Sequence, residues 1–277
     1  AENAYLGLVE ESPPDVVVVN SLRRVAFSTM FRDLEGKIPL VLYMREAHSV
    51  THLTISGLRP DAIVANSREF CHQVAALGMQ ARFVPSIIDL EAVAVETSRQ
   101  TVVLVNPIAE NRPDLLCSMA RARPDVTFVL QESWPLEPGA LASLQAEIGH
   151  LANVEFRPRV DSPVDVYADA RVLVATYPTG RPRVVVEAQY NGIPVVALDQ
   201  PALAEIAGPM DFLIDCDAPA TEWLAAVERY LDDEGFYAEA SASASAWARR
   251  GSIAPDAIAA DFEVALAGLA TGRDHDA

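Results

Sequence analysis

Residues 177–197 read YPTGRPRVVVEAQYNGIPVVA, and this stretch decides the fold. Pro182 suits the first turn of a helix, because its missing N–H would be unpaired there anyway. Asn191-Gly192 predicts the end of that helix, since glycine takes the left-handed conformation that follows many helices. The next proline bars further helix, and the apolar run after it predicts a short strand. The stretch is therefore loop, helix and strand, and it places one carboxylate, Glu187, inside an otherwise apolar helix.

The same alternation of helix and strand recurs along the chain. A Pro-Asp turn precedes the β-branched runs at residues 16–19, 62–65 and 126–130. Further strands are predicted at Leu40–Met44, Arg82–Val84, Thr101–Val105, Val154–Phe156, Val172–Ala175, Pro194–Leu198 and Phe212–Ile214. Runs that are apolar on both faces and separated by helices are typical of parallel strands covered by helices. The sequence therefore predicts an α/β fold in which a doubly wound parallel sheet occurs twice.

The polar stretch at residues 91–100 predicts the seam between two domains. We expect a first domain at residues 1–97 and a second at residues 98–251. Residues 252–277 are expected to form an amphipathic helix that could cross back to the first domain, followed by a frayed tail. The SASASA run at residues 241–246 predicts a packed helix rather than a linker.

Composition excludes several classes of protein. The formal net charge of −18, from 39 acidic and 21 basic residues, argues against a nucleic-acid partner, because phosphate binding needs a basic surface. No apolar run is long enough to span a membrane, and no signal peptide is visible, so we expect a cytoplasmic protein. The three cysteines show no CxxC spacing, and His48 and His52 form no metal-binding pattern, so no metal site is predicted.

Candidate ligand-binding residues follow from where the strands end. Two-domain α/β chains usually bind ligands at the carboxyl ends of their strands, in the cleft between the sheets. Neither GxGxxG nor GxxxxGK[ST] is present, which makes a dinucleotide dehydrogenase or a P-loop nucleotidase improbable. The loop after Thr101–Val105 leads into a helix start and carries Arg112, so it could bind phosphate. An ordinary turn with a solvated arginine is the alternative.

The loop at residues 177–183 leads into the second candidate helix start. Gly180 would let the backbone approach a ligand, with Arg181 close by. Arg183 and Glu187 are four residues apart and share one helix face. The guanidinium could hold a diphosphate while the carboxylate reaches a ribose diol, but a plain salt bridge would use the same spacing.

Other strand ends carry polar side chains as well. Arg45, Glu46 and His48 follow the strand Leu40–Met44, and they could form a site or a surface loop. Asn66-Ser67 looks like the cap of the next helix. Two arginines end the strand at residues 154–156, and one of them could face the cleft.

The assembled pieces resemble the retaining glycosyltransferases of family 4, which have the GT-B architecture. VVVEAQYNGIPVVALDQPALAEIAG resembles the family signature, in which a Glu stands in an EA-x-A-x-G-x-P-V-V-A context. DAIVANSREFCHQVAALG and FVPSIIDLE are similar to the family's VANS…LG…VVPNGID region, and LVNPIAENRPDLL occupies the place of its diphosphate-binding loop. The resemblance runs from about residue 12 to residue 270 and is most specific over 172–205.

This resemblance implies a GT-B fold of two Rossmann-like domains, with the acceptor on the first and the nucleotide sugar on the second. It implies transfer of a sugar from a nucleoside-diphosphate donor such as a UDP-sugar, with retention and without a metal or other cofactor. Glu187 would bind the ribose, and His48 would contact the transferred sugar. The implied catalytic set is His48, Thr179 and Glu187; the acceptor-side set is Arg45, Glu46 and Asn66; the donor-binding set is Asn106, Pro107, Asn111, Arg112, Arg159, Gly180, Arg181, Arg183 and Glu187.

The sequence departs from the family pattern in three places. Thr179 stands where the family has a second Glu, eight positions before Glu187, so the E-x7-E motif is degenerate. Asn111 stands where the family has a diphosphate-binding Lys. Compared with the family pattern, the sequence is expected to start near the middle of the first domain, so that either this domain is abbreviated or further residues precede the stretch.

Two rival hypotheses belong to other classes. A GT-B-like protein that binds nucleotide or sugar without turnover would fit Thr179 and the altered phosphate loop. A generic α/β hydrolase or a periplasmic-type sugar-binding protein is disfavoured by the absence of GxSxG and of a signal peptide.

Overall fold

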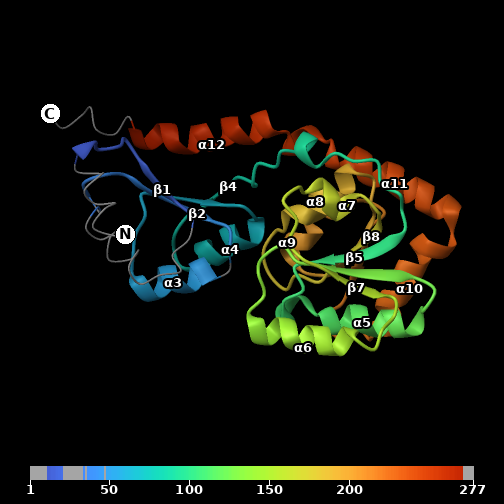
Figure 1. The fold of residues 1–277 in the computed structure, drawn as a ribbon. Helices are drawn as coiled ribbons and strands as arrows, with labels where there is room; N and C mark the ends of the chain where they lie inside the picture. Colours follow the sequence, from blue (N-terminus) through green and yellow to red (C-terminus); the bar gives the residue numbers. More distant parts are fainter. Residues whose placement is uncertain (1–10, 21–33, 35, 47, 271–277) are drawn as a thin grey trace. The chain divides into compact units, whose positions relative to one another are not determined.

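The computed structural model describes residues 11–20, 34, 36–46 and 48–270. Contacts divide the chain into two units (Figure 1). The first unit comprises residues 1–87, 179–181 and 251–277, and the second comprises residues 88–178 and 182–250. Residues 88–97, which the sequence assigned to the first domain, group with the second unit.

The first unit is built on a four-stranded parallel sheet. Its strands are β1 (Val17–Val19), β2 (Leu40–Met44), β3 (Ala62–Ala65) and β4 (Arg82–Phe83), in the order β1-β2-β3-β4. Its helices are α3 (His48–Ser56), α4 (Arg68–Ala76) and α12 (Pro255–Ala270), with a 3-10 turn, η3 (Gly251–Ile253), before the last.

Alternate residues of these strands enter two separate cores. Leu42 and Met44 of β2 pack with Leu53 of α3 and Phe70 of α4 on one face. Val41, on the opposite face of the same strand, packs in a cluster with Ile258 of α12. Side chains of a strand alternate between its faces, so helices cover both sides of this sheet.

The second unit is built on a six-stranded parallel sheet. Its strands are β5 (Thr101–Val105), β6 (Thr127–Gln131), β7 (Val154–Arg157), β8 (Ala170–Ala175), β9 (Val195–Leu198) and β10 (Phe212–Ile214). Its helices are η1 (Glu91–Val93), η2 (Ala109–Asn111), α5 (Pro113–Ala122), α6 (Pro138–Ile148), α7 (Val164–Tyr167), α8 (Arg183–Tyr190), α9 (Pro201–Ala204), α10 (Ala220–Asp232) and α11 (Glu234–Ala248).

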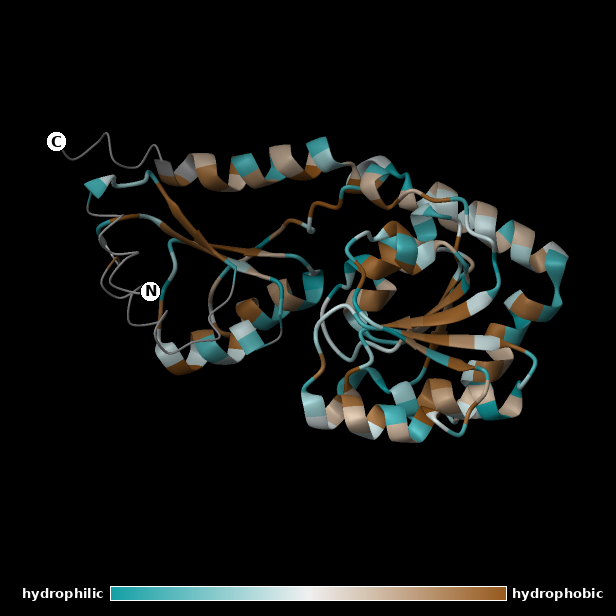
Figure 2. Cartoon of the chain, in the orientation of Figure 1, coloured by the Kyte–Doolittle hydropathy of each residue, from teal (hydrophilic) through white to brown (hydrophobic). Residues whose placement is uncertain are grey.

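Hydrophobic strands run through the middle of this unit, as Figure 2 shows. Val102 and Leu104 of β5 pack in one hydrophobic core with side chains of α5 and α10. The largest buried side chain of this core is Trp223, on α10. Val103 and Val105 point the other way and are also buried. In Figure 1, α5 and α6 lie on one side of the sheet and α8 and α9 on the other. The predicted fold class, α/β with two parallel sheets covered by helices, is confirmed.

Helix α8 ends as the sequence predicted. Gly192 has a φ of +68°, the left-handed conformation expected of the residue after a helix. Pro182 lies one residue before the helix, in an extended conformation, so α8 begins at Arg183 rather than at the proline. No helix among the described residues is both long and apolar enough to cross a membrane.

Candidate functional site

The order of strands in the second sheet locates a crevice. The order is β10-β9-β8-β5-β6-β7, so the chain adds strands on one side of β5 and then crosses to the other side at β8. Ligands of such sheets bind outside the carboxyl ends of the two strands where the order reverses. The loop at residues 106–112 follows β5, and residues 176–178 follow β8. Both therefore lie at the switch point.

The loop after β5 is held in an unusual backbone conformation. Asn106 and Arg112 have φ values of 61° and 51°, which are uncommon for residues other than glycine. The Asn111 amide Nδ2 donates to the Asn106 carbonyl at 2.8 Å, and the Thr176 hydroxyl donates to the Asn111 carbonyl. Pro107 and Asn111 are buried. The side chain of Asn111 thus supports the loop from inside, and strained backbone of this kind clusters at functional sites.

Two polar groups of this loop have hydrogen-bonding capacity that the described residues do not use. The Asn106 Oδ1 atom is buried and has no hydrogen-bond partner among the described residues. Arg112 is 42% exposed; it donates to the Cys216 carbonyl at 3.4 Å and lies 3.8 Å from Asp114. Both contacts are long, so its guanidinium keeps donors for an anion at the start of α5.

Glu187 is the buried carboxylate of α8. It is 9% exposed, and its Oε2 atom accepts a hydrogen bond from the Tyr167 hydroxyl at 2.7 Å. An ionised carboxylate offers about four acceptor positions, so one tyrosine leaves most of that capacity unused. Burying a carboxylate is costly unless it is hydrogen-bonded. The position therefore suits a ligand that donates hydrogen bonds.

Two tyrosines flank Glu187, of which Tyr167 is buried and Tyr177 is half-buried. Burial raises the pKa of Tyr167 well above its usual value, and the nearby negative charge of Glu187 raises it further. Burial and then Glu187 raise the pKa of Tyr177 in the same way. The Tyr177 hydroxyl donates to the Val105 carbonyl at 2.8 Å, at the end of β5. Both phenols therefore stay protonated and serve as donors.

Glu187 and Arg183 do not form the salt bridge that their spacing allowed. Among the described residues no ion pair joins them, and Arg183 is exposed. The partner of Glu187 is Tyr167 instead. The salt-bridge alternative was therefore wrong, because the carboxylate points into the unit while the guanidinium stays in solvent.

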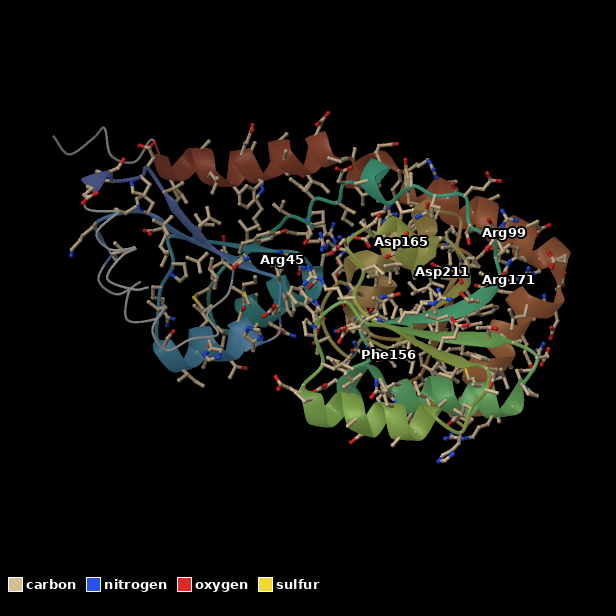
Figure 3. All side chains as sticks on the ribbon, viewed as in Figure 1. Arg45, Arg99, Phe156, Asp165, Arg171 and Asp211 are labelled. Carbon is tan, nitrogen blue, oxygen red and sulfur yellow. The ribbon has the colours of Figure 1, made fainter. Side chains whose placement is uncertain are left out.

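Helix α8 is anchored on its other side by Gln189. Its amide donates to the Ile206 carbonyl at 3.0 Å and to Asp211 Oδ2 at 2.6 Å. Asp211 also accepts backbone hydrogen bonds from Gly208 and Val195 (Figure 3). Burial raises the pKa of Asp211, although these donors oppose the effect. The network fixes the rotation of α8 and with it the direction of Glu187.

The loops after β6 and β7 are joined by one carboxylate. Glu132 accepts from the backbone N–H of Leu136 at 2.9 Å and from that of Arg159 at 3.1 Å. Arg159 is exposed, whereas Arg157 pairs with Glu155 and Asp169 at 2.8 Å. Of the two arginines at this strand end, Arg159 is therefore the one that can meet a ligand.

The first unit presents its own group of polar residues after β2. Arg45 and Glu46 follow the strand, and His48 opens α3. His48 Nε2 lies 2.8 Å from Glu46 Oε2, and its ring meets the His52 ring edge-on at 5.9 Å. These residues lie at one edge of the sheet, where Figure 3 labels Arg45.

A second part of this group comes from elsewhere in the sequence. Ser67, not Asn66, caps α4, with its hydroxyl accepting from Phe70 N–H at 3.2 Å. Asn66 is 3% exposed, and its Oδ1 atom has no hydrogen-bond partner in the described parts of the chain. The segment Thr179–Arg181 groups with this unit, and a Cβ on Gly180 would lie 3.8 Å from the Arg45 carbonyl.

The structure thus sorts the predicted site residues into two sets. The first unit holds Arg45, Glu46, His48, Asn66, Thr179, Gly180 and Arg181; the second holds Asn106, Pro107, Asn111, Arg112, Arg159, Arg183 and Glu187. Sequence reasoning missed Tyr167, Thr176 and Tyr177, which hold the second set in place. The available signal was that a buried tyrosine needs a partner for its hydroxyl.

Comparison with known proteins adds to this geometry. Residues 109–233 match the family model described as Glycosyl transferases group 1. HepE from Anabaena, solved in complex with UDP-glucose, has a TM-score of 0.83 at 17% identity, covering 96% of this chain and 82% of that one. The fold is GT-B. A sucrose-phosphate synthase from Thermosynechococcus elongatus has a TM-score of 0.78 at 16% identity, covering 97% of this chain and 77% of that one. No curated protein matches in sequence.

The family match and the GT-B fold together support a glycosyltransferase. The matched residues include the loop at 109–112, Arg159, Thr179 and Glu187. The match therefore falls on the crevice of the second sheet rather than on a peripheral part of the chain.

Proposed function

We propose that this protein is a retaining glycosyltransferase of family 4 that moves a sugar from a nucleoside-diphosphate donor, such as a UDP-sugar, to a small-molecule or glycan acceptor. The observation that carries the proposal is Glu187, a buried carboxylate beside the switch point of a GT-B sheet, which receives one hydrogen bond from the described residues. A ribose diol supplies the two further donors that such a carboxylate lacks. The co-substrate would be the nucleotide sugar, and no metal or other cofactor would be needed.

The diphosphate would be held by the loop after β5 and by the starts of α5 and α8. Helix starts present unpaired N–H groups and a partial positive charge to an anion. Arg112 and Arg183 add guanidiniums at these two starts, and Arg159 adds a third cation from the loop after β7. Fixed donors of this kind stabilise negative charge on the leaving diphosphate as the glycosidic bond breaks.

The polar group of the first unit takes the remaining roles. We assign contact with the transferred sugar to His48, and acceptor binding to Arg45, Glu46 and Asn66. The carboxylate of Glu46 lies 2.8 Å from His48 and orients the imidazole. The buried Oδ1 atom of Asn66 suits a hydroxyl donor on the acceptor.

A second candidate function is nucleotide-sugar binding without turnover. Thr179, which replaces the Glu that the family resemblance implies, favours it, because a hydroxyl cannot supply the charge of a carboxylate. The two candidates share the donor site and differ only in turnover. A binding assay therefore tests what they share, and a turnover assay separates them.

The decisive experiment measures thermal stability against UDP, GDP, dTDP and ADP for the wild type, Glu187→Gln and Glu222→Gln. Glu222 is an exposed carboxylate in the first turn of α10 and serves as the matched control. A nucleotide at 100 times its Kd adds about 2.7 kcal/mol, a rise of about 5 °C or more. We expect one nucleotide to raise the melting temperature of the wild type and of Glu222→Gln. The affinity of Glu187→Gln for the same nucleotide should be at least about tenfold lower, so its melting temperature should rise less.

Release of nucleotide from the matching nucleotide sugar then decides between the two functions. Turnover that Glu187→Gln lowers and Glu222→Gln keeps supports the transferase. Binding with no turnover in the presence of sugar acceptors supports the second candidate. If none of the four nucleotides stabilises the wild type, the assigned donor site is wrong, and both proposed functions are rejected.

A further inference from the structure

An open pocket on the second unit is formed by residues that the proposed function does not use. Its volume is about 740 Å3, within the range typical of small-molecule sites. One wall is the segment at residues 94–99, and the other is a side of α11. Its remaining lining, Tyr190 to Gly192, is the end of α8. The crevice residues Asn106, Arg112 and Arg183 do not line it.

A buried hydroxyl faces this pocket, which we call the α11 pocket. Ser241 lines it and is only 9% exposed, yet no hydrogen bond of its side chain is found among the described residues. Its Oγ lies where a side chain on Gly192 would be, 2.7 Å from the position of a Cβ there. A buried hydroxyl usually has a partner. Ser241 is therefore poised to bond to whatever fills the pocket.

Two arginines at the pocket have donors to spare. The Arg99 guanidinium makes no hydrogen bond to the described part of the protein, and it lies 5.3 Å from the centre of the Tyr237 ring. Arg249 lies 4.0 Å over the Tyr190 ring and uses only Nη1, which donates to Tyr190 O at 3.1 Å and to Ser245. Stacking on a ring holds each planar guanidinium while leaving its edge free for an anion.

These two arginines differ from six of the nine other arginines in the second unit, which pair with carboxylates; Arg159, Arg183 and Arg250 likewise have no ion pair among the described residues. The six that lie within 4.0 Å of a carboxylate are Arg112, Arg121, Arg123, Arg157, Arg171 and Arg229. No such ion pair is found for the two arginines of the pocket. In a chain of formal charge −18, guanidiniums without carboxylates mark a place where an anion from outside can bind.

A carboxylate at the pocket, that of Glu96, limits which ligands can bind there. Glu96 also lines the pocket and is exposed, with no hydrogen bond or ion pair found for its carboxylate in the described residues. A carboxylate repels a polyanion but accepts hydrogen bonds from hydroxyl groups. The pocket therefore combines donors for one anionic group with acceptors for neutral hydroxyls.

We propose that the α11 pocket binds a small phosphorylated sugar or polyol, with Arg99 and Arg249 at the phosphate and Glu96 and Ser241 at the hydroxyls. Arg99 reaches the pocket from a backbone held at φ 60°, and Thr97 accepts its N–H at 3.2 Å. Asn191 connects the pocket to Glu187: its side chain accepts from Val95 N–H and donates to the Glu187 carbonyl. A ligand here would thus rest against the same helix that carries Glu187.

The test measures binding of glucose 6-phosphate, glucose and inorganic phosphate to the full chain by calorimetry. We expect glucose 6-phosphate to bind more tightly than either of the other two, because only it engages both halves of the pocket. Arg99→Gln should weaken its binding about tenfold, the effect of losing a charged hydrogen bond. Ala242→Leu should weaken it too, because Ala242 is exposed and lines the pocket, so a larger side chain fills space without disturbing the core.

Two control variants test whether the effect comes from loss of positive charge in general, and whether the ligand binds in the crevice instead. Arg121→Gln removes an exposed arginine outside the pocket and should leave the affinity unchanged. Arg183→Gln should leave it unchanged as well, and UDP should not displace the sugar phosphate. The proposal is overturned if glucose 6-phosphate binds no better than phosphate, if Arg121→Gln weakens binding as much as Arg99→Gln, or if Arg183→Gln alone abolishes it. These outcomes do not depend on whether the donor assignment holds.

Discussion

At the scale of single residues, Glu187 and Tyr167 form the contact on which the donor site rests. The pair combines a charged acceptor that is 9% exposed with a phenol that is 1% exposed. A buried acceptor that loses its donor costs more than a neutral hydrogen bond contributes, because water cannot replace the missing group. Tyr177 offers a comparison, since its hydroxyl bonds to a neutral carbonyl.

We therefore predict that Tyr167→Phe lowers the free energy of unfolding by about 1–3 kcal/mol, and that Tyr177→Phe lowers it by about 1 kcal/mol. Both changes remove one oxygen, from a buried ring in Tyr167 and from a half-buried ring in Tyr177, and leave the packing volume almost unchanged. Urea unfolding at pH 7, compared at equal slope, measures both losses. An equal or larger loss for Tyr177→Phe would show that Glu187 finds another donor when Tyr167 is cut back.

The sequence pointed to Glu187 but not to its partner. Helix periodicity and the Asn-Gly stop placed the carboxylate in an apolar helix, which is a local property. Tyr167 lies 20 residues earlier, on a separate short helix, and no spacing rule connects the two. The possible salt bridge between Arg183 and Glu187 was wrong for a similar reason. Spacing on a helix shows which residues are close, but burial determines which neighbour a side chain contacts.

At the scale of elements, the turn that ends helix α8 contains a glycine whose position disfavours any side chain. Gly192 has a φ of +68°, and a Cβ there would lie 2.7 Å from Ser241 Oγ and 3.3 Å from the Ser241 carbonyl oxygen. Both the left-handed turn and the close approach of α11 therefore require a residue without a side chain at position 192. The sequence predicted the turn from Asn-Gly but had no means to predict the approach of α11.

Gly192→Ala should lower the free energy of unfolding by about 2 kcal/mol or more, from backbone strain and the contact with Ser241 together. Gly139→Ala is the matched control: Gly139 lies in α6 with nothing within 4 Å of an added Cβ, so alanine should be neutral or slightly stabilising. Thermal unfolding of the two variants measures both. A neutral Gly192→Ala would show that α11 shifts easily away from α8.

Elements were predictable to the extent that they follow one repeating pattern. The strands at 40–44, 101–105 and 212–214 have the predicted bounds, because their apolar runs are flanked by clear turn residues. Which strand lies beside which was not visible in the sequence, since the order around β5 depends on contacts between distant segments. The sequence therefore predicted which loops form the crevice, but not how these loops are arranged in space.

At the scale of the whole molecule, charge is the dominant feature. The 39 acidic residues exceed the 21 basic ones, and the excess repels itself in the folded state. Local ion pairs act in the opposite direction, most clearly around Arg123, which contacts Asp125, Glu228 and Asp232. Salt weakens both effects, so its net influence on stability shows which one is larger.

We predict that the melting temperature rises when sodium chloride is increased from about 20 to about 300 mM, because the Debye length shrinks from tens of ångströms to less than ten and screens the net repulsion. Thermal unfolding at constant pH 7 measures it. Arg123→Gln, which removes the ion-pair cluster, should steepen the rise. A fall in melting temperature with salt would mean that the ion pairs outweigh the repulsion.

The last helix has a consequence for how the chain folds during synthesis. Val41, Val64 and Val84 share a core with Ile258 of α12, and among the described helices only α12 contributes to this core, so its cover from α12 comes only when residues 255–270 have been made. At a typical rate of about 5–20 residues per second, these valines wait for their partner for about 10–40 s. A nascent chain would present that apolar face throughout this interval, which makes it a natural target for a ribosome-associated chaperone.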